Sequence, residues 1–339
     1  MKHFVVVAAC LAFSFSSAVL AEEICQTAEC KALSEDLLHH SMNESVAPCD
    51  DFYDYVCGKW AASHPQSPNS PRAINYFGLR QELVLEEIDE AFLNALNSSN
   101  DVIRSVATIY TDCLDNATIE KRGVTPLVET VHTILGDWPI LQKPAHNATS
   151  KTPHWQDLYV NTYAHTGIGA AFDLGSYHNF TLRKYIANIQ SGTISNDPTG
   201  MFITEKTHTE KYRAFLHKLL TTFFAVPDND RLKADIEAVL HLEQKLHTAY
   251  QETFKAHVGF GNFVGSYADL KVALKGKADW QSMVNQVLGK LSLTKVPLVT
   301  PTDQVHARVL PYIVEAVTAL ETTPISVVQN WLGLLIAGQ

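Results

Sequence analysis

Residues 48–60 read PCDDFYDYVCGKW, a run in which two cysteines enclose interleaved aromatic and acidic residues. The surrounding residues 22–60 are also rich in cysteine, because Cys25 and Cys30 precede Cys49 and Cys57 at short separations. Thiols pair in an oxidising compartment and stay reduced in the cytosol. Whether these cysteines form disulfides therefore depends on whether the protein is secreted.

The first 21 residues have the pattern of a secretory signal peptide. Basic residues at positions 1–3 precede apolar residues 4–20, and an acidic pair follows at 22–23. Small residues before the cleavage point suit signal peptidase, which predicts cleavage after Ala21. The alternative is an uncleaved signal anchor. No later segment has the roughly 18–20 uninterrupted apolar residues of a membrane-spanning helix, so we expect a secreted, extracellular chain with no membrane span after cleavage.

The remaining cysteines and the glycosylation sequons also suit secretion. Cleavage removes Cys10 and leaves five cysteines, so at least one thiol is free or pairs with a partner outside this chain. Glycans on Asn-x-Ser/Thr triplets need a solvent-facing acceptor. Five such triplets are predicted sites, at Asn43, Asn97, Asn116, Asn147 and Asn179.

Composition excludes several classes of protein. The 339 residues are 46% hydrophobic and 18% charged, which is typical of a folded globular chain large enough for about two domains. Lys and Arg number 26 against 36 Asp and Glu, a formal net charge of −10. A surface of this sign repels phosphates, so we expect no nucleic-acid partner.

The chain divides by composition into a cysteine-rich segment at 22–63, a connector at 64–71 and a mainly helical region at 72–339. The connector contains three prolines, which block a continuing helix. After it, Val84, Ile88, Ala91 and Ala95 recur at helical spacing and predict an amphipathic helix.

Later patterns predict two more helices and one strand. Residues 231–250 should form a helix capped by Asp228 or Asp230, and the final helix should be capped by Thr323, have Pro324 in its first turn and end at Gln339. Alternation over residues 155–163 predicts a strand. The fold class is therefore mainly α with minor β. The expected buried side of the 231–250 helix is Leu232, Ile236, Val239, Leu240 and Leu246.

Local motifs for catalysis are missing from the sequence. The 15 histidines include no His-Glu-x-x-His, the helical pattern that places two imidazoles on one zinc ion. His241 and His247 are six residues apart, about 240° around a helix, so they cannot share a metal. No Gly-x-Ser-x-Gly elbow occurs, and Gly259, Gly261 and Gly265 are better interpreted as a flexible turn than a dinucleotide loop. We expect no catalytic residue, metal or cofactor site in this chain.

Several runs together resemble the neprilysin and endothelin-converting-enzyme family of zinc metalloendopeptidases. Besides residues 48–60, the resemblance rests on Cys25-x4-Cys30, on IYTDCLD at 109–115, on GVTPL at 123–127 and on LGDWP at 135–139. It is specific up to about Pro139 and looser beyond.

The resemblance implies a helical lobe that covers a separate, thermolysin-like catalytic lobe and encloses a chamber for peptides. In the family, the zinc ligands and the substrate-holding Asn-Ala-Tyr lie in the later half, and this sequence contains none of these motifs. It further implies a local disulfide between Cys25 and Cys30, while Cys49, Cys57 and Cys113 bridge to segments beyond residue 339. The apolar end of the final helix is expected to need the same missing cover: Trp331, Leu332, Leu334, Leu335 and Ile336.

Arg72 and Arg80 resemble two arginines that line the family's chamber near the peptide's C-terminal carboxylate, a group that a guanidinium binds bidentately. An ordinary surface role is the alternative for each. The leading hypothesis is the non-catalytic half of a secreted neprilysin-like endopeptidase, inactive alone, whose partners are peptides or the missing catalytic half. The rivals are a standalone secreted pseudopeptidase that binds peptides or a protein, and an unrelated hydrolase using scattered His and acidic residues.

Overall fold

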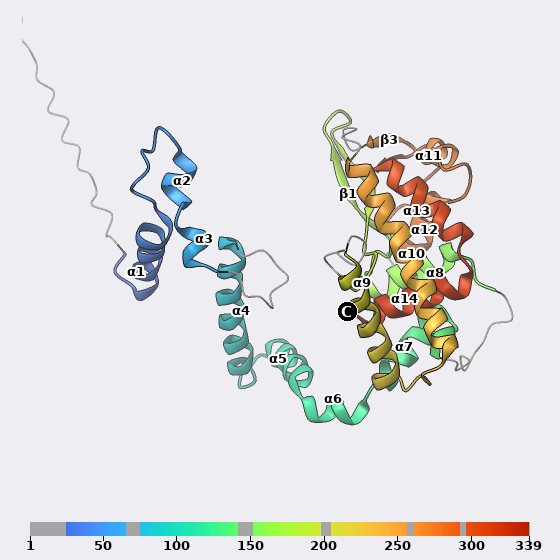
Figure 1. Cartoon of the computed structure of the whole chain (residues 1–339), viewed down its shortest axis with the longest axis horizontal. Coiled ribbons are helices and arrows are strands. Elements are labelled where there is room, and N and C mark those ends of the chain that lie inside the picture. Colours follow the sequence, from blue (N-terminus) through green and yellow to red (C-terminus); the bar gives the residue numbers. More distant parts are fainter. Residues whose placement is uncertain are drawn as a thin grey trace, which may run out of the picture. The chain divides into compact units, whose positions relative to one another are not determined.

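The computed structural model describes residues 25–65, 75–141, 152–197, 205–255, 261–291 and 296–338 (Figure 1). These residues are mainly α-helical with one small sheet, as the sequence predicts. The chain divides into two compact units, Met1–Thr111 and Asp112–Gln339. The predicted leader lies outside the described residues, as does most of the predicted connector at 64–71.

Short helices and one long pair make up the first unit. Near its start, the Lys59 N–H donates to the Ser41 carbonyl at 3.0 Å, and the rings of Trp60 and His64 stack. The elements are α1 (Ala28–Glu35), the π-helix η1 (Asp36–Ser41), α2 (Phe52–Cys57), α3 (Trp60–Ser63), α4 (Tyr76–Ala95) and α5 (Asp101–Leu114), whose last turn passes the unit boundary.

Helix α4 confirms the helix predicted around residues 84–95. Asn75 begins it, because its side chain accepts a hydrogen bond from the Gly78 N–H at 2.8 Å. The predicted apolar side of the helix is largely open to solvent, with Val84 50% and Ile88 40% exposed. Amphipathic spacing thus identified the helix correctly but gives no information on what covers its apolar side.

The second unit contains the hydrophobic core. Helices Thr125–Leu135, Trp155–Thr166 and Asp230–Lys255 pack against the final helix, Ile325–Ala337, and the hairpin of strands Phe172–Asn179 and Lys184–Ser191 extends from one end (Figure 1). The elements are α6 (Asn116–Arg122), α7 (Thr125–Leu135), η2 (Pro139–Leu141), α8 (Trp155–Thr166), β1 (Phe172–Asn179), β2 (Lys184–Ser191), α9 (Lys206–Lys218), η4 (Leu219–Phe223), α10 (Asp230–Lys255), β3 (Phe263–Ser266), α11 (Tyr267–Ala273), α12 (Trp280–Lys290), β4 (Gln304–Ala307), α13 (Leu310–Thr322) and α14 (Ile325–Ala337).

The four described strands form one sheet in the order β1-β2-β4-β3. Strands β1 and β2 form an antiparallel hairpin, in which Phe172 is opposite Ser191. Strand β4 runs parallel to β2 and antiparallel to β3. Because β2 and β4 are parallel and distant in sequence, the intervening helices α9 to α12 make the crossover between them.

The strand predicted at residues 155–163 is wrong, because this segment lies in helix α8. His154 and Asp157 form a reciprocal capping box at its start, and Gly167 ends it in a left-handed conformation with φ of 72°. Trp155, Leu158 and Tyr159 are buried at helical spacing. This helical repeat overrides the alternation of Leu158, Val160 and Thr162 with Tyr159, Asn161 and Tyr163 in the same run.

Helix α10 confirms the predicted helix at 231–250 and its buried side. The predicted cap is different. The Asn229 side chain accepts from the Leu232 N–H at 2.9 Å, whereas Asp228 lies 3.0 Å from His217 Nε2 and Asp230 is the first helical residue.

The predicted uncovered end of the final helix is also wrong. Helix α14 follows Pro324, which occupies the cap position, and Thr323 donates its hydroxyl to the Ala319 carbonyl of the preceding helix. The apolar residues predicted to lack a cover are all buried within this chain's own core. Burial of each large side chain contributes about 1.5–3 kcal/mol, so α14 is central to the stability of the second unit.

Candidate functional site

No group of three His, Cys, Asp or Glu that could hold a metal ion occurs among the residues that the structure describes. His241 and His247, both on α10, have different surroundings. His241 is exposed, whereas His247 Nε2 lies 3.1 Å from the Ser195 hydroxyl. Burial lowers the pKa of His247 to about 4, against the opposing charge of Asp197. At neutral pH the partly buried imidazole of His247 is therefore uncharged.

A buried polar network surrounds His247 and connects three elements of the second unit. The Tyr212 hydroxyl donates to Glu243 at 3.2 Å, and the Asn196 N–H donates to the Tyr212 oxygen. Burial raises the pKa of Glu243 well above its usual value, and the nearby Asp197 adds to this while Tyr212 opposes it. Oxygen Oε2 of Glu243 is buried and has no hydrogen-bond partner among the residues that the structure describes. The network links α9, α10 and the loop after β2.

Only one of the two predicted substrate-binding arginines is described. Arg72 lies outside the described residues. Arg80 lies on α4, where its Nε donates to the Tyr76 hydroxyl at 3.0 Å and its guanidinium lies 5.1 Å from the centre of the Tyr76 ring. This contact orients the guanidinium along the helix surface, and the terminal nitrogens remain able to bind a carboxylate. The predicted role of Arg80 stays a prediction.

The described cysteines fall into one disulfide pair and three unpaired residues. Cys25 and Cys30 form a disulfide with Cα atoms 5.9 Å apart, which confirms this predicted pairing. The Thr27 side chain between them caps α1 by accepting from the Cys30 N–H. Among the described residues, Cys49, Cys57 and Cys113 are unpaired; Cys57 is partly buried and the other two are exposed.

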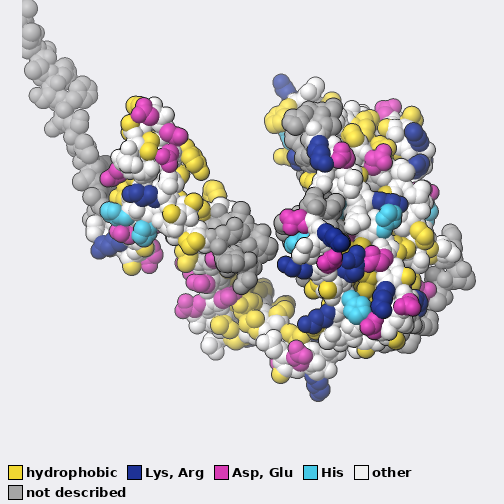
Figure 2. All heavy atoms as spheres, viewed as in Figure 1, with side chains coloured by type: hydrophobic (Ala, Val, Ile, Leu, Met, Phe, Trp, Pro, Cys, Tyr) yellow, Lys and Arg dark blue, Asp and Glu magenta, His cyan; other side chains and the backbone are white. Residues whose placement is uncertain are grey.

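Cys113 lies in line with exposed apolar residues on α5. Val102, Val106 and Ile109 precede it at intervals of four, three and four residues, which place all four side chains on one face of the helix. Val102 is 72% exposed and Ile109 65% exposed. We call these four residues the α5 stripe. Figure 2 shows hydrophobic side chains gathered on the surface over α4 and α5.

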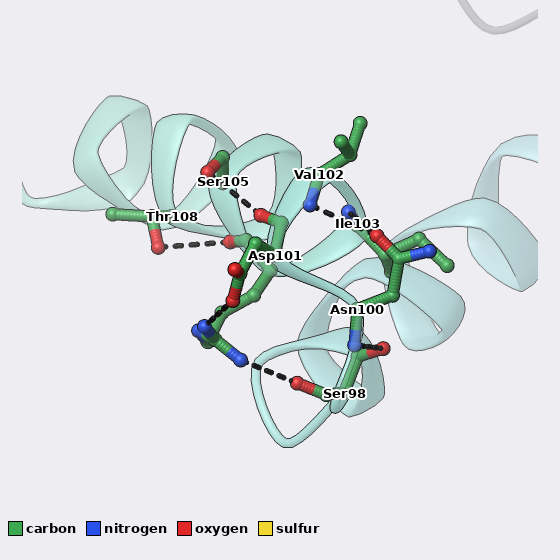
Figure 3. Close-up of polar contacts among 8 residues, drawn as sticks. Ser98, Asn100, Asp101, Val102, Ile103, Ser105 and Thr108 are labelled. Atoms are coloured by element: carbon green, nitrogen blue, oxygen red, sulfur yellow. Dashed lines mark hydrogen bonds and ion pairs between the residues drawn. The ribbon is translucent and has the colours of Figure 1, made fainter.

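The polar side of α5 is satisfied by local contacts (Figure 3). The Asn100 side chain accepts from the Val102 and Ile103 N–H groups at 2.9 and 3.4 Å, and caps the helix. Arg104 pairs with Asp101 and donates to the Ser98 carbonyl at 2.7 Å. Among the described residues, the α5 stripe is thus the exposed side of the helix that makes no such polar contacts.

Four of the five predicted glycosylation sites are described, and they differ in accessibility. Asn97 and Asn116 are exposed, on either side of α5, and Asn43 is half-buried. Asn179 is only 9% exposed, at the end of β1, and its side-chain oxygen accepts from the Leu182 N–H at 2.9 Å. Asn147 lies outside the described residues. Glycosylation itself stays a prediction at all five.

Residues 135–139 have a structural role that the sequence motif alone did not indicate. Asn330 of α14 accepts from the Ile140 N–H at 2.7 Å, and Gln329 donates to the Leu135 and Asp137 carbonyls. The Trp138 ring packs so closely on Gly333 that a Cβ there would lie 2.4 Å from the Trp138 Cε2 atom. Two polar residues within an apolar helix were the available signal, because buried polar groups need partners.

Comparison with known proteins gives the family. The chain is 28% identical over 234 residues to Neprilysin-11 of Caenorhabditis elegans, and 33% identical over 119 residues to human membrane metallo-endopeptidase-like 1. The sequence model for the N-terminal part of peptidase family M13 matches residues 48–337. The chain belongs to peptidase family M13. Residues 48–60, the run in which two cysteines enclose aromatic and acidic residues, open the matched region of this M13 chain.

This M13 chain is similar to only part of each relative. The match to Neprilysin-11 covers 66% of the chain and 27% of the relative, and the match to human membrane metallo-endopeptidase-like 1 covers 35% and 15%. In the open-state structure of the zinc metalloprotease Zmp1 of Mycobacterium tuberculosis, 42% of that protein aligns with 86% of this chain, with a TM-score of 0.59 and 16% identity. That likeness supports the fold. The described residues of this M13 chain do not supply the ligand set that zinc needs.

Proposed function

We propose that this chain is the non-catalytic, chamber-covering half of a secreted neprilysin-like zinc metalloendopeptidase, and that it does not hydrolyse peptides alone. Its partner is a catalytic half that carries the zinc ligands, and its substrates are peptides. The match to the N-terminal part of the M13 family supports the first point. In this proposal zinc contributes a Lewis acid from the catalytic half, and residues of this chain cover and orient the peptide.

The α5 stripe is the observation that carries the proposal. An exposed apolar strip marks an interaction surface when it is contiguous, and here a thiol extends the strip by one helical turn. A partner that covers Val102, Val106 and Ile109 would also bring its own surface to Cys113. Apolar contact and a disulfide from the same helix face suit a permanent partner.

Arg72 and Arg80 complete the proposal on the substrate side. Their similarity to family arginines supports binding of the peptide's C-terminal carboxylate, and the charge-assisted pair would orient the peptide. Secretion is supported by the leader pattern, by the Cys25–Cys30 disulfide and by the sequons. Among the described residues, no helix has the length and apolar character needed to cross a membrane.

Co-expression with the later half of an M13 relative tests the pairing. The expected product is a disulfide-linked heterodimer on non-reducing gels, which cysteine-to-serine substitution at Cys49, Cys57 and Cys113 together abolishes. Val106→Asp with Ile109→Asp should reduce heterodimer yield at least tenfold. The matched control is Ser105→Asp with Thr108→Asp, on the polar side of the same helix. Equal heterodimer yield from both double variants would overturn the role of the α5 stripe.

A standalone secreted pseudopeptidase is the second candidate, and the burial of α14 favours it. Trp331, Leu332 and Leu335 are at most 1% exposed within this chain, so the second unit forms a core without an added half. The thiol content separates the two candidates. Three reactive thiols in the purified mature chain support the missing-half proposal, whereas one reactive thiol shows that Cys49, Cys57 and Cys113 have formed an internal bridge and supports the pseudopeptidase.

A further inference from the structure

The β1–β2 hairpin ends in a loop of residues 180–183, which follows the last register pair, Asn179 with Lys184. The Asn179 side chain accepts a hydrogen bond from the Leu182 N–H at 2.9 Å, and Arg183 closes the loop in a left-handed conformation with φ of 50°. All eight residues of each strand are paired with the other strand. The loop is therefore held in one shape at the end of a fully paired hairpin.

Large apolar side chains at this end of the hairpin are open to solvent. Phe180 is 80% and Tyr185 73% exposed, and Leu182 is also exposed. None of the three belongs to the hydrophobic core. The His178 ring packs edge-on against both aromatic rings, with its centre 4.7 Å from that of Phe180 and 5.0 Å from that of Tyr185, so these contacts hold the two rings together. We call Phe180, Leu182, Arg183, Lys184 and Tyr185 the hairpin tip.

The hairpin tip is basic, although the protein as a whole is acidic. Residues 174–186 contain Arg183 and Lys184 and no Asp or Glu, whereas the chain has a formal net charge of −10. Both basic side chains are exposed, and neither makes a hydrogen bond or ion pair with a residue that the structure describes. Lys184 does interact electrostatically with Asp303. Figure 2 shows hydrophobic and basic side chains together at this end of the hairpin.

We propose that the hairpin tip binds the surface of an anionic phospholipid membrane. Phe180 and Leu182 enter the boundary between headgroups and acyl chains, where their exposed apolar surface leaves water. Tyr185 lies at the level of the headgroups, which suits its apolar ring and polar hydroxyl. Arg183 and Lys184 bind the lipid phosphates. The contact is peripheral, because the unpaired backbone of a loop cannot enter the hydrocarbon region.

Charge distinguishes this occupant from a second protein surface. An exposed apolar patch alone suits any apolar partner, and the α5 stripe is such a patch, because none of its four residues is charged. In the hairpin tip, two cations lie among the exposed apolar side chains. A positive surface attracts anionic lipid and would be repelled by cations of a partner. The combination therefore favours a phosphate-bearing surface with an apolar layer beneath it.

Co-sedimentation of the mature chain with vesicles of equimolar phosphatidylcholine and phosphatidylserine tests the proposal. The reference protein and all variants carry Thr181→Ala, which removes the glycosylation triplet of Asn179 but keeps the hydrogen bond from Leu182 to the Asn179 side chain. Binding to vesicles of phosphatidylcholine alone should be at least about tenfold weaker, because they lack the negative surface potential.

Paired substitutions separate the apolar and charged parts of the contact. Phe180→Ser with Leu182→Ser should weaken binding to the mixed vesicles at least about tenfold. Its matched control is Val272→Ser with Leu298→Ser, at two other exposed apolar residues of the second unit, and should bind as the reference does. All these side chains are exposed, so thermal unfolding of both variants should match that of the reference.

Charge reversal gives a second, independent pair. Arg183→Glu with Lys184→Glu should also weaken binding at least about tenfold. The control is Lys211→Glu with Lys218→Glu, which makes the same change of net charge at exposed residues of α9 and should leave affinity nearly unchanged. Absence of vesicle binding by the reference protein, or equal affinities of the tip variants and their controls, would overturn the inference.

Two other occupants of the hairpin tip are outcomes of the same experiments. Heterodimer yield with a catalytic M13 half should not change in Phe180→Ser with Leu182→Ser, so failure of this inference and failure of the proposed function are distinguishable. Loss of the heterodimer in this variant would identify the catalytic half as the occupant instead. Self-association of the reference protein that the same variant abolishes, measured by sedimentation velocity, would identify a second copy, and either result without vesicle binding contradicts the inference.

Discussion

Glu243 is an ionisable residue whose burial should govern the pH dependence of stability. Burial, and to a lesser degree the nearby Asp197, raises the pKa of its carboxyl above the ordinary value of 4.5. The folded protein therefore holds this proton more tightly than the unfolded chain. The stabilisation that the folded state gains from binding this proton is complete below about pH 4.5 and is lost as the pH rises through the folded pKa of Glu243. Glu243→Gln should raise the free energy of unfolding at pH 7, because the amide stays neutral.

His247 makes the free energy of unfolding change with pH in the opposite direction. Its folded pKa of about 4 lies below the ordinary 6.5, so its contribution is present above pH 6.5 and is lost as the pH falls toward 4. In Glu243→Gln the effect of the glutamate is removed and that of His247 remains. The free energy of unfolding of this variant should therefore increase with pH between 4.5 and 6.5. Denaturant titrations across this range measure both slopes. Glu237→Gln, at an exposed residue paired with Arg213, is the control and should keep the wild-type profile; an identical profile for Glu243→Gln would contradict the argument.

At the scale of the elements, a larger side chain in the contact between α14 and residues 135–141 should destabilise the fold. Gly333 lies against the buried Trp138 ring, and a Cβ there would come within 2.4 Å of the ring carbon Cε2. Gly333→Ala should lower the free energy of unfolding by about 1–3 kcal/mol, because a packed core accommodates an extra methyl only by strain. Urea titration of the purified chain measures the change.

Gly289→Ala is the matched control for this element. Gly289 lies in helix α12, and a Cβ there would meet nothing within 4 Å. Alanine should stabilise the helix by about 0.5–1 kcal/mol, because glycine loses more conformational freedom on folding. If Gly333→Ala left the free energy of unfolding unchanged or raised it, as Gly289→Ala should, the close packing of Gly333 on Trp138 would be refuted.

Helical periodicity predicted the positions of α4, α10 and α14, but the sequence could not show what each helix contacts. Alternation at 155–163 was misleading, because its β-branched residues coincide with a helical repeat and because His154, the capping residue, is uncommon in that role. The apolar residues of α14 are buried as a set, but the prediction that their cover comes from outside this chain was wrong. Their hydrogen-bond partners in residues 135–141 are distant in the sequence: Asn330 and Ile140 are 190 positions apart, and Gln329 and Leu135 are 194 apart. Such distant packing carries no local signal.

The same limit applies to the candidate site. The thiol of Cys113 was recognised from its motif, yet its alignment with Val102, Val106 and Ile109 required α5 to be known as one continuous helix. The groove between α10 and α13 gave no sequence signal, because its lining residues come from two segments that become neighbours only in the fold. Cysteine chemistry is therefore readable from sequence, whereas surfaces made by two helices are not.

At the scale of the whole molecule, the separation of peptide binding from peptide cleavage is the central expectation. Arg80 is the described residue predicted to bind peptides, whereas the described residues do not provide three grouped ligands for a catalytic zinc. Purified mature chain incubated with zinc and small peptides should therefore show no chelator-sensitive cleavage by chromatography. Addition of a catalytic M13 half should restore cleavage, which the triple cysteine-to-serine variant should lose. The opposite outcome is that the chain alone cleaves peptides, with EDTA stopping the reaction and zinc restoring it. That result would mean that residues outside the described ranges complete a zinc site, and the proposal that catalysis needs a separate half would be wrong.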